Sequence, residues 1–146
     1  MKRLLALLAL SVSCAMPWQA SAAEPVESLT DEDQVAIQAV VQTQLDALAD
    51  DDAAIAFEQT TDQSKLQIGS PDNFMRMIKE QYNPVYQHQL ALFSDPRVVH
   101  GMVLQVVRLT SRDSHVWLAL FRMERDEGQA WKIDGCQLLE TTSLSI

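Results

Sequence analysis

Two predicted β-strands joined by a polar turn make up residues 102–125, whose sequence is MVLQVVRLTSRDSHVWLALFRMER. Apolar residues, many of them β-branched or aromatic, dominate both ends of this stretch, as they do in strands. The four residues between the ends, Ser-Arg-Asp-Ser at 111–114, are typical of a turn. We therefore expect strands over residues 102–110 and 115–125 that pair as neighbours in an antiparallel sheet.

Side-chain alternation within these strands predicts that both faces of the sheet are apolar. Successive residues of a strand point to opposite faces. In the second strand one face carries Trp117, Ala119, Phe121 and Met123, and the other carries Val116, Leu118 and Leu120. A sheet with one wet face would instead alternate with polar residues. One face must then meet the helices and the other needs a different cover. We expect a homodimer formed through Val116, Leu118 and Leu120.

The rest of the chain places helices before the strands. Shorter strands are expected over residues 90–93 and 98–100, separated by Ser94-Asp95-Pro96, and a last strand over 129–139 follows the turn Asp126-Glu127-Gly128. The order predicts an α+β fold, with N-terminal helices packed on one face of a curved antiparallel meander.

Capping residues mark the predicted helices. Thr30 is a good N-cap for an amphipathic helix that stops at the run Asp50-Asp51-Asp52, and a short helix is expected over residues 53–59. Ser70 followed by Pro71 begins another helix, which Pro84 ends or bends.

The segment between the second and third of these helices has no clear periodicity. We expect residues 60–69 to be irregular, with Leu66 and Ile68 tucked into the core.

The first 22 residues have the three parts of a secretory signal. A basic start, an apolar run over residues 4–12 and the small-x-small sequence Ala20-Ser21-Ala22 predict cleavage after Ala22 and a periplasmic location. Cys14 has Ser11 three positions before it, where a lipoprotein signal needs a large aliphatic residue, so we do not expect lipidation. Residues 23–29 would then be a tether and 30–146 a single domain. No transmembrane segment is expected in the mature chain.

The charge balance excludes one class of partner. The 146 residues carry a formal charge of −9, which becomes −11 if Lys2 and Arg3 leave with the signal. Binding to nucleic acid needs a surplus of Lys and Arg, so we expect no nucleic-acid partner. Cys136 would be the single cysteine of the mature chain, and we interpret it as a small apolar side chain rather than a reactive thiol. No zinc, calcium or cofactor motif is present, and we expect neither metal nor cofactor.

Several short motifs carry a family resemblance. They are Gly69-Ser70-Pro71 with Phe74, Tyr82-x-Pro84-Val85-Tyr86, Gln105-Val106-Val107, and the ending Trp131…Gly135-Cys136. Over about residues 34–139 the chain resembles a bacterial exported family catalogued as domain of unknown function 4864, and more broadly the nuclear-transport-factor-2-like (cystatin-like) superfamily. The resemblance implies a cone-like α+β fold, a pocket between the helices and the concave sheet face, and frequent dimerisation. The family has no assigned activity, so the resemblance implies no catalytic residue.

Candidate site residues follow from the expected pocket. Its candidate lining is Tyr82, Tyr86, Trp117, Phe121, Met123 and Arg122. His115 and Asp134 are the weak candidates for acid/base work, because both side chains can exchange protons. The structural alternative places His115 in solvent at a strand end and pairs Asp134 with Arg122 across neighbouring strands.

Three functions stay open. The leading hypothesis is a non-catalytic exported domain that binds a small apolar ligand or a protein partner. The alternatives are a pocket acid/base enzyme and a dimeric accessory or structural module. A pocket packed full by Phe121, Trp117 and Met123 would favour the last of these, whereas a buried ionisable group with a perturbed pKa would favour the enzyme.

Overall fold

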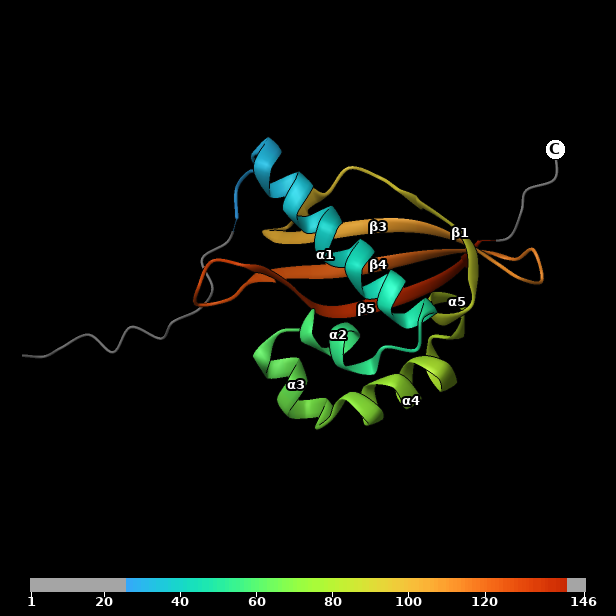
Figure 1. Cartoon of the computed structure of the whole chain (residues 1–146). Coiled ribbons are helices and arrows are strands. Elements are labelled where there is room, and N and C mark those ends of the chain that lie inside the picture. Colours follow the sequence, from blue (N-terminus) through green and yellow to red (C-terminus); the bar gives the residue numbers. More distant parts are fainter. Residues whose placement is uncertain (1–25, 142–146) are drawn as a thin grey trace, which may run out of the picture.

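The computed structural model describes residues 26–141 (Figure 1). The expected signal peptide and Cys14 lie outside the described residues. The predicted α+β class is confirmed, because helices come first and an open antiparallel sheet follows. Within the described residues no helix is both long and apolar enough to cross a membrane.

Helix α1 (Asp31–Ala49) begins at the predicted cap. The Thr30 hydroxyl accepts a hydrogen bond from the Asp33 backbone N–H at 3.1 Å, and the Asp33 carboxylate accepts one from the Thr30 N–H at 3.0 Å. This reciprocal pair is a capping box, which satisfies two N–H groups that the helix itself cannot bond. Helix α1 lies across strands β3, β4 and β5 (Figure 1). Its fully buried residues include Ile37, Val41 and Leu45.

Four shorter helices follow, and one of them was not expected. They are α2 (Ala53–Glu58), α3 (Asp62–Ile68), α4 (Pro71–Gln81) and α5 (Asn83–Tyr86). Helix α3 occupies the segment predicted to be irregular. The Thr61 hydroxyl caps it by accepting from the Ser64 N–H at 3.2 Å, and Gly69 ends it in a left-handed conformation with φ 98°. The predicted burial of Leu66 is wrong, since 85% of it is exposed, whereas Ile68 does pack against the core.

The sheet has the strand order β1–β3–β4–β5, with β2 also paired to β3. The strands are β1 (His88–Phe93), β2 (Arg97–Val99), β3 (Met102–Ser111), β4 (Val116–Arg125) and β5 (Trp131–Thr141). Strand β1 pairs with residues 107–111 of β3, and β2 pairs with residues 102–104. Both therefore lie along the same edge of β3, and the predicted break at Ser94-Asp95-Pro96 separates them.

Side-chain alternation gives the sheet two distinct faces. The inner face meets the helices and carries the buried Val103, Gln105, Val107, Leu109, Ala119, Phe121, Met123 and Ile133. The outer face carries the alternate residues, which the strand registers place in rows. They are Leu90, Leu92, Arg97, Val99, Met102, Leu104, Val106, Arg108, Thr110, Val116, Leu118, Leu120, Arg122, Glu124, Lys132, Gly135, Gln137, Leu139 and Thr141.

Candidate functional site

The space between the helices and the inner face is filled by core side chains. Phe121 is fully buried, Met123 is 2% exposed, and Trp117 is partly buried against the same cluster. Tyr82 and Tyr86 pack at its border. The structure thus places five of the six predicted lining residues in the core or at its margin.

The hydroxyl of Tyr86 has a specific role at that margin. It donates to the Asp51 carboxylate at 2.7 Å, and the Lys79 ammonium lies 3.1 Å from the same oxygen. These two partners hold the pKa of Asp51 below its usual value, with the tyrosine hydrogen bond as the larger cause. The cluster joins the end of α1 to α4 and α5.

Asp134, one of the two candidate catalytic residues, is held in a bulge of β5. The register with β4 shifts between Arg122 and Met123, which leaves Asp134 as the extra residue. Two nitrogens of Arg122 donate to its carboxylate at 2.7 and 3.0 Å, so the predicted cross-strand ion pair is confirmed. The Thr61 hydroxyl donates to the other oxygen at 2.9 Å, and the Ser64 hydroxyl to the backbone carbonyl at 3.1 Å. Asp134 therefore ties helix α3 to the sheet.

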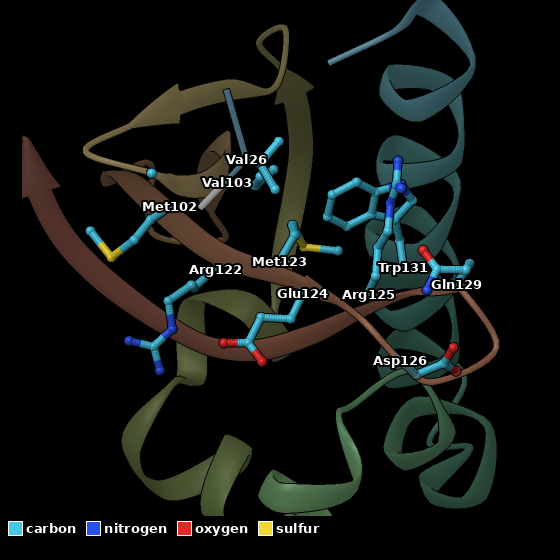
Figure 2. Close-up of a pocket in the computed structure, with 11 residues that line it drawn as sticks. Val26, Met102, Val103, Arg122, Met123, Glu124, Arg125, Asp126, Gln129 and Trp131 are labelled. Atoms are coloured by element: carbon cyan, nitrogen blue, oxygen red, sulfur yellow. The ribbon is translucent and has the colours of Figure 1, made fainter. Parts of the chain in front are cut away.

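A hollow of about 610 Å³ wraps around the end of the sheet next to Asp134. Figure 2 shows the apolar side chains of Val26, Val103 and Met123 beside the indole of Trp131, with Arg122 and Glu124 turned to the other side of β4. Desolvation and the nearby charge of Asp134 raise the pKa of Glu124. The lining comes from both sheet faces, so this hollow is an open rim rather than an interior pocket.

A second cluster of side chains joins the β4–β5 hairpin beside this hollow to α1. The Arg125 guanidinium lies over the Trp131 ring, 4.8 Å from its centroid, and donates to the Asp33 carboxylate at 2.5 Å. The Trp131 indole N–H donates to the same oxygen at 3.2 Å. The Thr30 backbone N–H is the largest of several donors that lower the pKa of Asp33 to about 2. The cap of the first helix is thereby joined to the β4–β5 hairpin.

His115, the other candidate catalytic residue, stands apart from Asp134. It lies directly before β4, and its Nδ1 is 3.6 Å from an Asp113 oxygen and 3.4 Å from a Glu140 oxygen. More than half of its side chain is exposed. The two candidate acid/base residues flank opposite ends of β4, so the structure does not bring them into one site. Within residues 26–141 no group of three or more His, Cys, Asp or Glu side chains is placed to hold a metal ion.

The outer face of the sheet carries many apolar side chains at the surface. Leu90, Leu92, Val99, Met102 and Leu139 are 39–53% exposed. The remaining apolar members of the outer face are partly buried, and they are Leu104, Val106, Val116, Leu118 and Leu120. The described helices pack on the inner face, so the outer apolar side chains meet only their neighbours in the sheet. Single exposed apolar residues are common at protein surfaces, whereas a continuous patch across four strands is typical of an interaction site.

A shallow hollow of about 290 Å³ lies within the outer face. Gly135 contributes no side chain there, and Leu104, Leu120 and Arg122 surround the gap. Cys136, which also borders it, pairs with Phe121, and burial raises the pKa of its thiol to about 12. The thiol stays protonated at neutral pH, which supports its interpretation as an apolar side chain.

Sequence reasoning identified three outer-face residues, Val116, Leu118 and Leu120, and missed the contribution of the edge strands. Leu90, Leu92 and Val99 lie in short segments whose alternation is too brief to assign a face. The signal that could have found them is the register of these segments with β3, which the chain order alone does not supply.

A family model described as "Domain of unknown function (DUF4864)" matches residues 30–146. The chain belongs to this family. The match covers all ten described helices and strands, including the outer face and the Asp134 bulge. No curated protein sequence matches the chain. No solved structure matches it.

Proposed function

We propose that this DUF4864 domain is a non-catalytic association domain, which binds the apolar surface of another protein through its outer face. The observation that carries the proposal is the continuous apolar surface of β1, β2, β3, β4 and β5 on the side opposite the helices. Burial of apolar area is the main favourable term in protein association. Covering a surface of this kind with a partner lowers the free energy of the complex.

The size of the outer face supports a protein partner. Four strand positions about 4.8 Å apart and ten residues rising about 3.3 Å each give roughly 600 Å². Each partner of a standard-size protein interface buries about 800 Å². The outer face is also too open for a small apolar ligand, since ligand pockets enclose most of the surface of what they bind.

The composition of the outer face supports the same conclusion. Interface cores are enriched in apolar residues and Arg, and depleted in Lys, Glu and Asp. Among the described outer-face residues the arginines are Arg97, Arg108 and Arg122, whereas Glu124 and Lys132 lie together at one end of the sheet. The whole chain has 20 acidic residues, so the outer face is much poorer in carboxylates than the rest of the protein.

The filled interior supports a role without catalysis. Phe121 and Met123 leave little room beside the inner face, and the Asp134 carboxylate is bonded to Arg122 and Thr61. An acid/base enzyme remains the alternative, and the Asp134→Asn variant addresses it, since a proton-transfer role would be lost while an association role would persist.

A homodimer through the same face is the second candidate. The roughly 600 Å² of the outer face approaches what one subunit of a small dimer buries. We also propose that the domain acts in the periplasm and has a cystatin-like cone architecture. These proposals rest on the signal-like residues 1–22 and on the order of helices and strands.

Site-specific photocrosslinking in cells that make the protein tests the association proposal. A photoreactive amino acid replaces Leu92 or Leu139 on the outer face, and Val35 or Leu66 on the helices serve as controls of similar or greater exposure. We expect discrete protein adducts from the outer-face positions alone. Equal adducts from the helix positions, or none from any position, would contradict the proposal. An adduct of twice the chain mass would assign the face to a second copy.

A further inference from the structure

We infer that the outer face fits a partner surface that is apolar and carries carboxylates. This inference rests on the association function proposed above. In the described part of the chain, Arg97 and Arg108 are exposed and take part in no ion pair. Most other cations do: Lys65 and Lys132 pair with Glu58, Lys79 with Asp51, Arg122 with Asp134, and Arg125 with Asp33.

The registers place the two arginines within the apolar surface. Arg97 lies beside Leu104, and Arg108 lies between Leu92 and Leu118. Leu104 and Arg108 are four residues apart on β3, so Arg97 and Arg108 are roughly 14 Å apart. A partner that covers the leucines must also cover these two guanidinium groups.

Covering a guanidinium without a partner is unfavourable. A buried charge loses its hydration, and the loss is offset only when an opposite charge or a hydrogen-bond acceptor replaces the water. Arg recognises carboxylates well because its planar group presents several N–H donors in a fixed arrangement. The partner surface therefore needs acceptors, and carboxylates are the acceptors that also match the charge.

The same charges disfavour a second copy of this chain as the occupant. Two outer faces brought together would add Arg97 and Arg108 of one copy to those of the other. The face offers only the Glu124 carboxylate in return, apart from Asp134, which already pairs with Arg122.

Two synthetic amphipathic helices serve as probes of the outer face. Each has about 18 residues, or ~27 Å of helix, which matches the ~33 Å length of the ten-residue strands. Both carry leucines along one side. Glutamates border the leucines in one peptide, and lysines stand at the same positions in the other. Binding to the purified protein is measured by fluorescence anisotropy at low and at physiological salt.

We expect the glutamate peptide to bind about tenfold more tightly than the lysine peptide at low salt, with the difference shrinking as salt rises. The double variant Arg97→Glu/Arg108→Glu should reverse the preference. Arg76→Glu/Arg112→Glu is the matched control, because it makes the same double charge change at exposed positions on α4 and in the β3–β4 turn, away from the outer face, and should keep the preference. If the charge reversal fails to fold, Arg97→Gln/Arg108→Gln should abolish the preference.

Four results would overturn the inference, and the fourth, crosslinked dimers, comes from the crosslinking experiment described above. The first is equal binding of the two peptides or preference for the lysine peptide, and the second is a glutamate preference that survives both double variants. The third is binding of neither peptide. Crosslinks from Leu92 and Leu139 would then still support the association function, so failure of the charge inference and failure of that function are distinguishable. Crosslinked dimers in place of acidic partners would also overturn it.

Discussion

The inner and outer faces of the sheet are built from similar side chains and have opposite surroundings. On β3 the inner Val103, Val107 and Leu109 are at most 2% exposed, whereas the outer Met102 is 44% exposed. The polar residues differ in kind. The inner face has Gln105, whose amide N–H₂ donates to the Ser94 carbonyl at 2.7 Å, and the outer face has arginines. Apolar content therefore does not show which face is covered, whereas the charged residues do, because a covered face cannot hold an unpaired charge.

Matched leucines give the largest expected difference between the faces. Leu109 on the inner face is fully buried, and Leu92 on the outer face is 53% exposed. We expect Leu109→Ala to lower the free energy of unfolding by about 2–5 kcal/mol, because it opens a cavity in the core. Leu92→Ala should cost less than about 1 kcal/mol in the isolated protein. Urea unfolding measures both. Equal costs would show that the outer face is covered within the protein as studied.

The contacts of Asp33 with Thr30, Arg125 and Trp131, which join α1 to the β4–β5 hairpin, predict a stability that is sensitive to acid. The pKa of Asp33 in the folded protein is about 2, below the ordinary aspartate value of 3.8. The stabilisation is therefore complete above about pH 4 and is lost as the pH falls from about 4 towards 2. We expect Asp33→Asn to lower stability at pH 7 by on the order of 1–2 kcal/mol. Its stability should also change less than that of the natural protein over the acid range.

Thermal unfolding at several pH values measures this effect. Asp31→Asn is a suitable control, because Asp31 lies in the same first turn and outside the Trp131 and Arg125 contacts. An identical acid slope in the Asp33 variant and the natural protein would contradict the prediction.

The contacts of Asp134 with Arg122 and Thr61 should contribute less to the free energy of unfolding. Asp134→Asn weakens the ion pair with Arg122, whose side chain is 49% exposed, and can keep the hydrogen bond from Thr61. We expect a loss of about 1 kcal/mol, because solvent screens the half-exposed Arg122 even though only 11% of the Asp134 side chain is exposed. Comparison with Thr61→Val by chemical denaturation separates the ion pair from the hydrogen bond. A loss of several kcal/mol from Asp134→Asn alone would mean that the bulge depends on the full charge.

The smallest effect is expected at the outer hollow. A Cβ on Gly135 would lie 3.6 Å from the nearest Arg122 nitrogen, which is ordinary contact. We expect Gly135→Ala to change stability by no more than about 0.5 kcal/mol, with stabilisation the expected sign, because alanine restricts the unfolded chain. Thermal melts check the stability, and the peptide assay checks binding. A large destabilisation would show that the backbone here requires glycine.

Local chemistry accounts for the elements that sequence reasoning predicted well. Thr30 and Ser70 each accept a hydrogen bond from the backbone N–H three residues ahead, so the signals that start α1 and α4 can be recognised from nearby residues. Helix α3 escaped prediction because the Thr61 cap acts without an apolar stripe behind it. The Thr61 side chain is also committed to Asp134, which is 73 residues away in the chain.

The candidate site could likewise be predicted only in part from the sequence. Alternation along β4 identified Leu118 and Leu120 as members of a second apolar face, because the period of a strand is local. The same alternation could not tell that Phe121 and Met123 fill the space beneath the helices. That outcome depends on how closely α1 approaches the sheet.

The sequence by itself determined the α+β class, the two main helix starts and the apolar character of both sheet faces, since each follows from spacing along one segment. The tertiary structure alone decided that edge strands β1 and β2 complete the outer face and that Arg97 and Arg108 are set among its leucines. It also separated His115 from Asp134. These features depend on strand register and helix packing, which join residues far apart in the chain and are fixed only when the whole core forms.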